Sequence, residues 1–205
     1  MARGDANGGA RRTDCSSDGL DDLVYLTQVS ALGIANNPDL AERMARANFR
    51  YAFVGFESMQ PSLLRDMHKA TTPEINRRAA EALRRNNIVV IAGLIAGFPD
   101  DTAATVANQF KLLQRLRPDG LYAQYPTPYP GTKLREELLE ADLVVNRDRW
   151  EEYDGFHCNV RTNHLSHEEL FRAHCAAAQL FFLSPRLLLG NRFLRLHFWR
   201  YATVG

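Results

Sequence analysis

The chain has 205 residues, of which 45% are hydrophobic, and it carries 25 basic side chains against 24 acidic ones. This composition supports one domain with a real core, and the net charge of +1 gives no reason to expect nucleic acid or an acidic partner. No apolar run approaches the roughly 20 residues of a membrane span, and three scattered cysteines form no disulfide framework, so we expect a reducing, cytoplasmic setting.

Residues 1–20 are rich in Gly, Arg, Asp and Ser, and they predict a disordered segment. Strands and helices are then predicted to alternate over residues 21–135, and residues 136–205 form a helical extension. A capping box at Ser166–Glu169 is expected to open a long helix there. The predicted strands and helix starts, in chain order, are a strand at Leu23–Ala35, a helix from Asn37-Pro38 with Leu40, Met44 and Ala47 buried, a strand at Tyr51–Glu57, a helix from Thr72-Pro73, a strand at 88–97, a helix from Ala103 and a strand at Leu121–Tyr125.

The stretch from Ile88 to Thr102 is the most informative part of the chain. Its apolar run shows no polar alternation, which is typical of a strand buried on both faces of a parallel sheet. Gly93 and Gly97 allow a ligand to approach the backbone near the end of that strand, or they serve close packing alone. The β-α alternation predicts four parallel strands, which form either an open α/β sheet or a piece of a larger barrel.

Four motifs, in register, carry a resemblance to a known family. They are Gly55-Phe-Glu57-Ser58, Gly93-Leu-Ile95-Ala-Gly97-Phe-Pro-Asp100, Gln124-Tyr-Pro-Thr127-Pro-Tyr129-Pro-Gly-Thr132, and Tyr153-Asp-Gly-Phe with Val160-Arg-Thr162. Together they resemble the C-terminal half of radical S-adenosylmethionine (SAM) enzymes. The nearest likeness is to those with a cobalamin-binding domain, such as magnesium-protoporphyrin ester cyclases and hopanoid methylases. The resemblance covers residues 23–185.

The resemblance implies a partial (β/α) barrel that binds SAM and a 4Fe–4S cluster, with cobalamin in the full-length parent. The family holds its cluster with a Cys-x3-Cys-x2-Cys loop, and here Cys15, Cys158 and Cys175 are too far apart to form one. We therefore expect a barrel fragment of four parallel strands with covering helices, without the cluster loop. The N-terminal half of the barrel is then either absent or supplied by another chain.

The resemblance also transfers functional roles to individual residues. Those assigned to cofactor binding are Gln28, Glu57, Ser58, Ile95, Ala96, Gly97 and Gln124, and those on the substrate side are Thr127 and Tyr129. Asp100 stands where the family carries an acidic residue. Glu57 could instead be a solvated strand end or a salt-bridge partner.

Two other features have plainer interpretations. Histidines and cysteines between His157 and Cys175 lack the paired spacing of a zinc site, so no metal site is predicted there. The tail from Arg186 to Gly205 is basic and aromatic; such a segment lies on a membrane surface or packs on its own domain, and packing is favoured.

Three functions remain in competition at this point. The first is a fragment of a radical SAM enzyme whose parent methylates or oxidatively cyclises a hydrophobic small molecule. The second is a non-catalytic truncated remnant. The third is a small α/β protein that binds a nucleotide without an iron–sulfur cluster.

Overall fold

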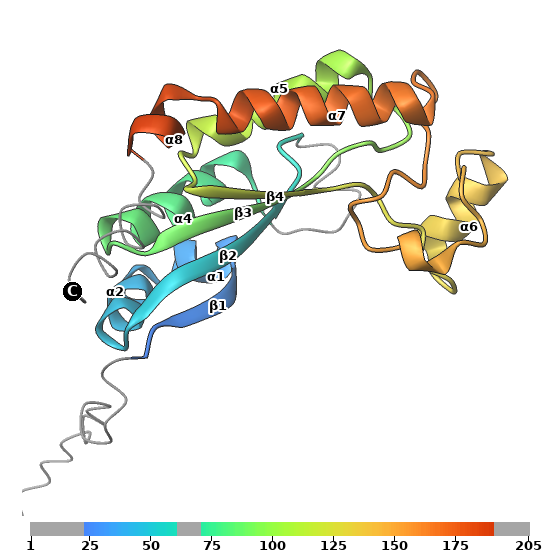
Figure 1. The fold of residues 1–205 in the computed structure, drawn as a ribbon. Helices are drawn as coiled ribbons and strands as arrows, with labels where there is room; N and C mark the ends of the chain where they lie inside the picture. The colour runs from blue at the N-terminus through green and yellow to red at the C-terminus, as the bar shows by residue number, and fades with distance from the viewer. Residues whose placement is uncertain (1–22, 61–70, 191–205) are drawn as a thin grey trace, which may run out of the picture.

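The computed structural model describes residues 23–60 and 71–190 (Figure 1), so the predicted disordered segment 1–20 and most of the basic tail lie outside the described residues. Strands and helices alternate over the first part, as the sequence predicts. The elements are β1 (Tyr25–Ser30), α1 (Ala31–Asn36), α2 (Pro38–Arg46), β2 (Phe49–Glu57), α4 (Pro73–Arg85), β3 (Val89–Ile95), α5 (Ala103–Arg115), β4 (Gly120–Gln124), α6 (Lys133–Glu140), the 3-10 helix η2 (Trp150–Glu152), α7 (His167–Phe182) and α8 (Pro185–Gly190).

The strands form one four-stranded parallel sheet in the order β1-β2-β3-β4. This confirms the predicted α/β class, with consecutive strands side by side and helices as the connections. Because β1 and β4 do not pair with each other, the sheet stays open across the part of the chain that the structure describes. All four carboxyl ends point the same way, which gathers the strand-end residues at one edge.

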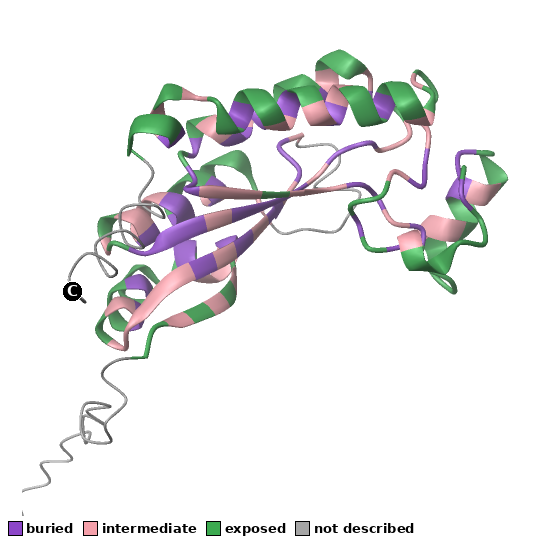
Figure 2. Ribbon diagram, viewed as in Figure 1, coloured by how far each residue is buried: buried purple, intermediate pink, exposed green. Residues whose placement is uncertain are grey.

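The core lies between the sheet and the helices that cover it. Along β2, Ala52, Val54 and Phe56 are fully buried, whereas the alternate residues Tyr51 and Phe53 are partly exposed on the other face. Such alternation shows that the described helices cover one face of the sheet and leave the opposite face more exposed (Figure 2). On the covered side α1 packs against α4, and α5 packs against α7.

Hydroxyl caps begin the helices where the sequence predicts them. The Thr72 hydroxyl accepts a hydrogen bond from the Ile75 N–H at 3.2 Å at the start of α4. At the start of α7, the Ser166 hydroxyl accepts from the Glu169 N–H at 3.2 Å, and the Glu169 carboxylate accepts from the Ser166 N–H at 2.9 Å. The two bonds that the hydroxyls accept satisfy N–H groups that a helix leaves unpaired in its first turn.

The predicted strand at Leu23–Ala35 is wrong in its second half. The strand ends at Ser30, whose hydroxyl accepts from the Gly33 N–H at 2.9 Å and caps the short helix α1. Ala31, Ile34 and Ala35 are buried with helical rather than strand spacing, and six residues are too few for that period to show in a sequence.

The predicted start of α2 is right in position but wrong in its cap and its buried face. The Asn37 side chain makes no cap for α2 and instead donates to the Gly33 carbonyl at 2.8 Å, which ends α1. Of the three residues expected to be buried, Met44 is buried, Leu40 is exposed and Ala47 is only partly buried. Ala41 is buried instead of Leu40.

The helical extension leaves the sheet beyond β4. Helix α6 and η2 lie at the carboxyl-end edge, and α7 then returns along α5 (Figure 1). Within this segment, Val144 and Val160 form an isolated antiparallel β-bridge. Among the described helices, none is both long and apolar enough to cross a membrane.

Candidate functional site

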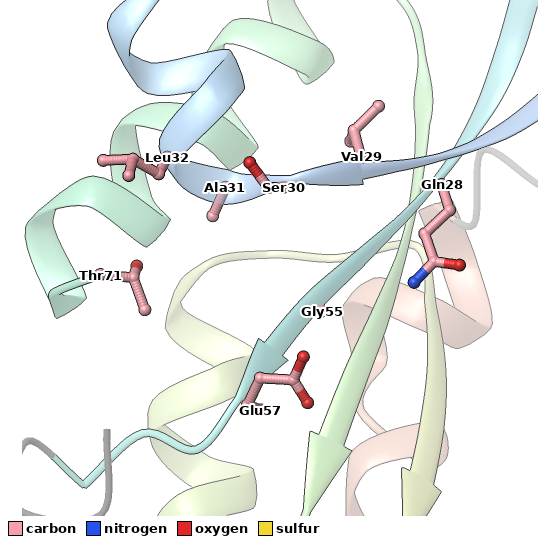
Figure 3. A pocket seen from close by; sticks show the side chains of 8 residues that line it. All are labelled: Gln28, Val29, Ser30, Ala31, Leu32, Gly55, Glu57 and Thr71. Atoms are coloured by element: carbon pink, nitrogen blue, oxygen red, sulfur yellow. The ribbon is translucent and has the colours of Figure 1, made fainter. Parts of the chain in front are cut away.

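A pocket opens where β1 and β2 end. Its volume is about 340 Å³, within the usual range for small-molecule sites. In Figure 3 the amide of Gln28 and the carboxylate of Glu57 extend on either side of Gly55. The residues that line the pocket are Gln28, Val29, Ser30, Ala31, Leu32, Gly55, Glu57 and Thr71. The pocket therefore combines a carboxylate, an amide and hydroxyl groups with an apolar wall.

Glu57 reaches the pocket through an irregularity of β2. The pairing with β3 slips between Gly55 and Glu57, so that Gly55 lies opposite Gly93 while Glu57 lies opposite Leu94. Glu57 also has a φ of 61°, in the left-handed region that residues with a side chain rarely adopt. Such bulges and strained residues re-aim a side chain and occur preferentially at functional sites.

Gly55 leaves the space that the Glu57 carboxylate occupies. A β-carbon at position 55 would lie 2.6 Å from Glu57 Oε1, closer than such atoms approach. The side chain of Glu57 thus folds back over the strand that carries it, and only glycine accommodates that conformation without moving the carboxylate.

The loop after β3 is organised by Asp101, a residue that the sequence motifs did not single out. Asp101 is 3% exposed. Its Oδ2 accepts from the N–H groups of Gly97 and Phe98, each at 2.9 Å. Its Oδ1 accepts from Gln60 Nε2 at 2.9 Å and from the Thr105 hydroxyl at 2.8 Å. The neighbouring Asp100 is exposed and bonded to Asn163, so the loop depends on the second of the two acidic residues.

The structure brings two of the predicted cofactor-binding residues, Gln28 and Glu57, into one pocket. Ser58 does not line it: the residue is fully buried, and its hydroxyl donates to Gln109 Oε1 at 2.8 Å on the covered side of the sheet. Ile95 ends the neighbouring strand β3, Ala96 and Gly97 follow it, and none of the three lines the pocket. A ligand role for these residues stays a prediction.

The predicted residues at the end of β4 lie farther along the same edge. The Gln124 side chain packs against Gly155, where a β-carbon would approach Gln124 Nε2 to 2.2 Å. The Thr127 hydroxyl donates to the Tyr125 carbonyl at 3.3 Å. Tyr129 is 48% exposed, which leaves its ring available to a ligand.

Three aromatic rings lie together on the uncovered face of the sheet. The Tyr122 ring meets the Phe53 ring edge-on at 5.6 Å and the Phe156 ring edge-on at 4.7 Å. A β-carbon on Gly93 would lie 2.8 Å from the Cζ atom of Phe53, too close for a side chain at position 93. Gly93 therefore serves packing between strands in this structure.

His174 on α7 is a buried packing residue. Its ring lies 4.3 Å from that of Tyr125 and 5.2 Å from that of Phe110, measured between centroids. Burial lowers the pKa of His174 to about 4, against a smaller opposing effect from the Gln124 backbone. The imidazole is therefore neutral at physiological pH.

The described residues do not fit the cluster that the resemblance implies. No group of three or more His, Cys, Asp or Glu side chains is placed to hold a metal ion in the ranges 23–60 and 71–190. Burial raises the pKa of the Cys158 thiol to about 11, and its sulfur donates to the Val160 carbonyl at 3.3 Å. A protonated thiol is a poor ligand for iron.

No family model matches this chain. The curated proteins with similar sequences include methyltransferases, a cyclase and a methylase. An uncharacterized methyltransferase of Pyrococcus horikoshii is 28% identical over 159 residues, which is 77% of this chain and 34% of that protein. The anaerobic magnesium-protoporphyrin IX monomethyl ester cyclase of Rubrivivax gelatinosus is 32% identical over 57% of this chain and 21% of its own. The hopanoid C-2 methylase of Rhodopseudomonas palustris is 27% identical over 62% and 24%, respectively. The chain thus spans about a third or less of these relatives.

Solved structures show the same fold. The radical SAM methyltransferase TsrM from Kitasatospora setae, determined with cobalamin and a 4Fe–4S cluster bound, matches with a TM-score of 0.53 at 20% identity, over 62% of this chain and 23% of that one. At this identity the likeness concerns the fold alone. Together with the sequence relatives, it confirms the resemblance to radical SAM enzymes that the motifs indicate.

Proposed function

We propose that this chain contributes the SAM-binding side of a radical SAM methyltransferase or cyclase that acts on a hydrophobic small molecule. The observation that carries the proposal is the pocket at the ends of β1 and β2, into which a strained Glu57 directs its carboxylate. The similar methyltransferases, cyclase and methylase support the reaction class.

The chemistry of the pocket suits a nucleoside with a polar substituent. The Glu57 carboxylate can accept hydrogen bonds from ribose hydroxyls, and the Gln28 amide can both donate and accept. Gly55 leaves room for the Glu57 carboxylate above the strand, and the ligand would lie beside that carboxylate. The apolar residues of the same wall can cover the sugar or the base.

A 4Fe–4S cluster, when bound, supplies the electron that cleaves SAM in this enzyme class, and the described residues of this chain do not hold it. We therefore place the cluster ligands outside the described residues or on another polypeptide. Cobalamin, which TsrM binds in its solved structure, would likewise belong to the complete protein. What the described chain contributes is the binding and orientation of the nucleoside portion.

Calorimetric titration of the purified chain with SAM tests the proposal. We expect weak binding that falls about tenfold in Glu57→Gln, since one charge-assisted hydrogen bond is lost. Gly55→Ala should have a similar effect because the new methyl group displaces the carboxylate. Glu140→Gln, an exposed glutamate on α6, is the matched control. Binding that is the same in Glu57→Gln and Glu140→Gln would contradict the assignment.

A nucleotide-binding protein without a cluster is the second candidate, because the carboxylate, amide and hydroxyl groups of the pocket would also suit a nucleotide's sugar. The same titration separates the two. ATP binding tighter than SAM binding, lost in Glu57→Gln, would support the second candidate, whereas selectivity for SAM and S-adenosylhomocysteine supports the first.

A further inference from the structure

Large apolar side chains are exposed at the end of α7 and on α8. Five of them occur within ten residues, and we call them the α7–α8 patch: Leu180 (71% exposed), Phe182 (47%), Leu183 (63%), Leu188 (58%) and Leu189 (89%). Exposed apolar residues that stand singly are ordinary, but a group of this size marks an interaction surface.

Helix α8 is anchored in a way that keeps these leucines outward. Leu187 is buried in the core, at 3% exposure, and Arg186 donates a hydrogen bond to the Pro118 carbonyl just before β4. Since the inward-facing position is already taken by Leu187, the next two residues, Leu188 and Leu189, project into solvent. Figure 2 shows α8 largely exposed, with one short buried segment.

Basic side chains lie near Arg186 of α8. Burial lowers the pKa of Arg186, the nearby Asp119 carboxylate raises it, and the guanidinium groups of Arg117 and Arg84 lower it by smaller amounts. Asp119 is itself 3% exposed and accepts from the Val90 N–H at 3.0 Å, so its charge lies inside the protein. Three arginines, Arg84, Arg117 and Arg186, thus lie near one another at this end of the molecule.

The sequence that follows has the same character. From Pro185 to Gly205 the chain contains no Asp or Glu, and it carries Arg186, Arg192, Arg195 and Arg200. Phenylalanine, tryptophan and leucine alternate with these arginines. Aromatic and basic residues next to exposed leucines are the combination by which proteins bind the interface of a bilayer.

We propose that the α7–α8 patch docks on an anionic phospholipid surface. The leucines would enter the boundary between headgroups and acyl chains, and the arginines would face the headgroup phosphates. A surface that joins exposed leucines to basic side chains complements a negatively charged bilayer surface. The candidate pocket lies at the carboxyl ends of the strands, whereas α8 sits by the amino end of β4, so the bound protein would keep that pocket away from the lipid (Figure 1).

Cosedimentation of the full chain with vesicles tests this proposal. One set of vesicles contains phosphatidylcholine alone, and the other contains equal parts of phosphatidylcholine and phosphatidylglycerol. We expect binding to the second set, with a loss of about tenfold or more in Leu188→Glu/Leu189→Glu and in Leu189→Glu alone. Raising salt from about 0.1 M to about 0.5 M should also weaken binding, because it screens the arginines. Phe171→Glu, a 50% exposed position near the start of α7, is the control and should bind as the parent does.

Three results would overturn the proposal. The first is no binding to anionic vesicles by the folded parent chain. The second is equal binding by the parent and the double variant, or an equal loss in Phe171→Glu. The third is a self-associated parent that does not bind vesicles and becomes monomeric in the double variant, which would make the patch a contact between copies. Because Leu189 is 89% exposed, the single variant separates a loss of binding from a loss of folding.

Discussion

Removal of the Asp101 carboxylate should destabilise the protein strongly. The substitution Asp101→Ala leaves four donors without their acceptor: the N–H groups of Gly97 and Phe98, the Gln60 amide and the Thr105 hydroxyl. Each buried donor left unpaired costs about 1–3 kcal/mol. Water can reach the partly exposed Gln60, and Thr105 keeps a second acceptor 3.0 Å away in the Thr102 carbonyl, so the two backbone groups dominate. We expect the free energy of unfolding to fall by about 3 kcal/mol.

Urea denaturation followed by circular dichroism measures this change, and the adjacent residue provides the control. Asp100→Ala removes only an exposed hydrogen bond from Asn163, so it should change the free energy of unfolding by about 0.5 kcal/mol or less. Asp101→Asn keeps one acceptor oxygen and should fall between the two. If Asp101→Ala and Asp100→Ala unfold at the same urea concentration, the role assigned to the buried carboxylate is refuted.

Three further predictions concern backbone strain and titration. Glu57→Gly should be about 1 kcal/mol more stable to urea than Glu57→Ala, because glycine tolerates the φ of 61°; the reverse order would argue against strain. Gly97→Ala should lower the free energy of unfolding by about 2 kcal/mol or more, because Gly97 has a φ of 109° and the new carbon would lie 2.9 Å from Leu170. Gly131→Ala should lower it by about 1 kcal/mol, since the space around Gly131 is open. Equal melting temperatures of the two variants would contradict this. The lowered pKa of His174, about 4 when folded against 6.5 when unfolded, gives stability that is complete above pH 6.5 and is lost as the pH falls toward 4, by about 3 kcal/mol. A pH series of urea melts should show that decline in the parent and not in His174→Phe.

Much of the fold could be predicted because its signals are local or strongly periodic. The strand at 88–97 shows as a continuous apolar run, although the expected burial of both faces is incomplete, since Ile91 and Ile95 are partly exposed. The caps at Thr72 and Ser166 mark their helices within a few residues. Helix α1 was missed because it is shorter than the span over which a helical period can be distinguished from a strand. Its start depends on one hydroxyl, that of Ser30, which a sequence pattern does not separate from an ordinary strand residue.

The candidate site was predicted less completely, for a different reason. Gln28 and Glu57 come together because β1 and β2 are neighbours, which the strand order implies. The bulge that turns Glu57 and the burial of Ser58 follow from a slip of one residue in pairing, which no local pattern reports. Asp101 was overlooked beside Asp100 because its importance lies in where its donors meet in space.

Hydrogen bonds between the loop after β3 and the C-terminal region affect the order of folding. The Thr162 hydroxyl donates to the Asp101 carbonyl at 2.8 Å across a separation of 61 residues, and the Asn163 N–H donates to the Pro99 carbonyl at 2.8 Å. Contacts between such distant residues form late, since the entropy of closing a long loop must first be overcome. During synthesis, the strands up to β4 can pair while this loop is still free, and the loop becomes fixed only when the segment before α7 arrives. A ligand that requires the fixed loop would therefore bind the finished chain and not its growing precursor.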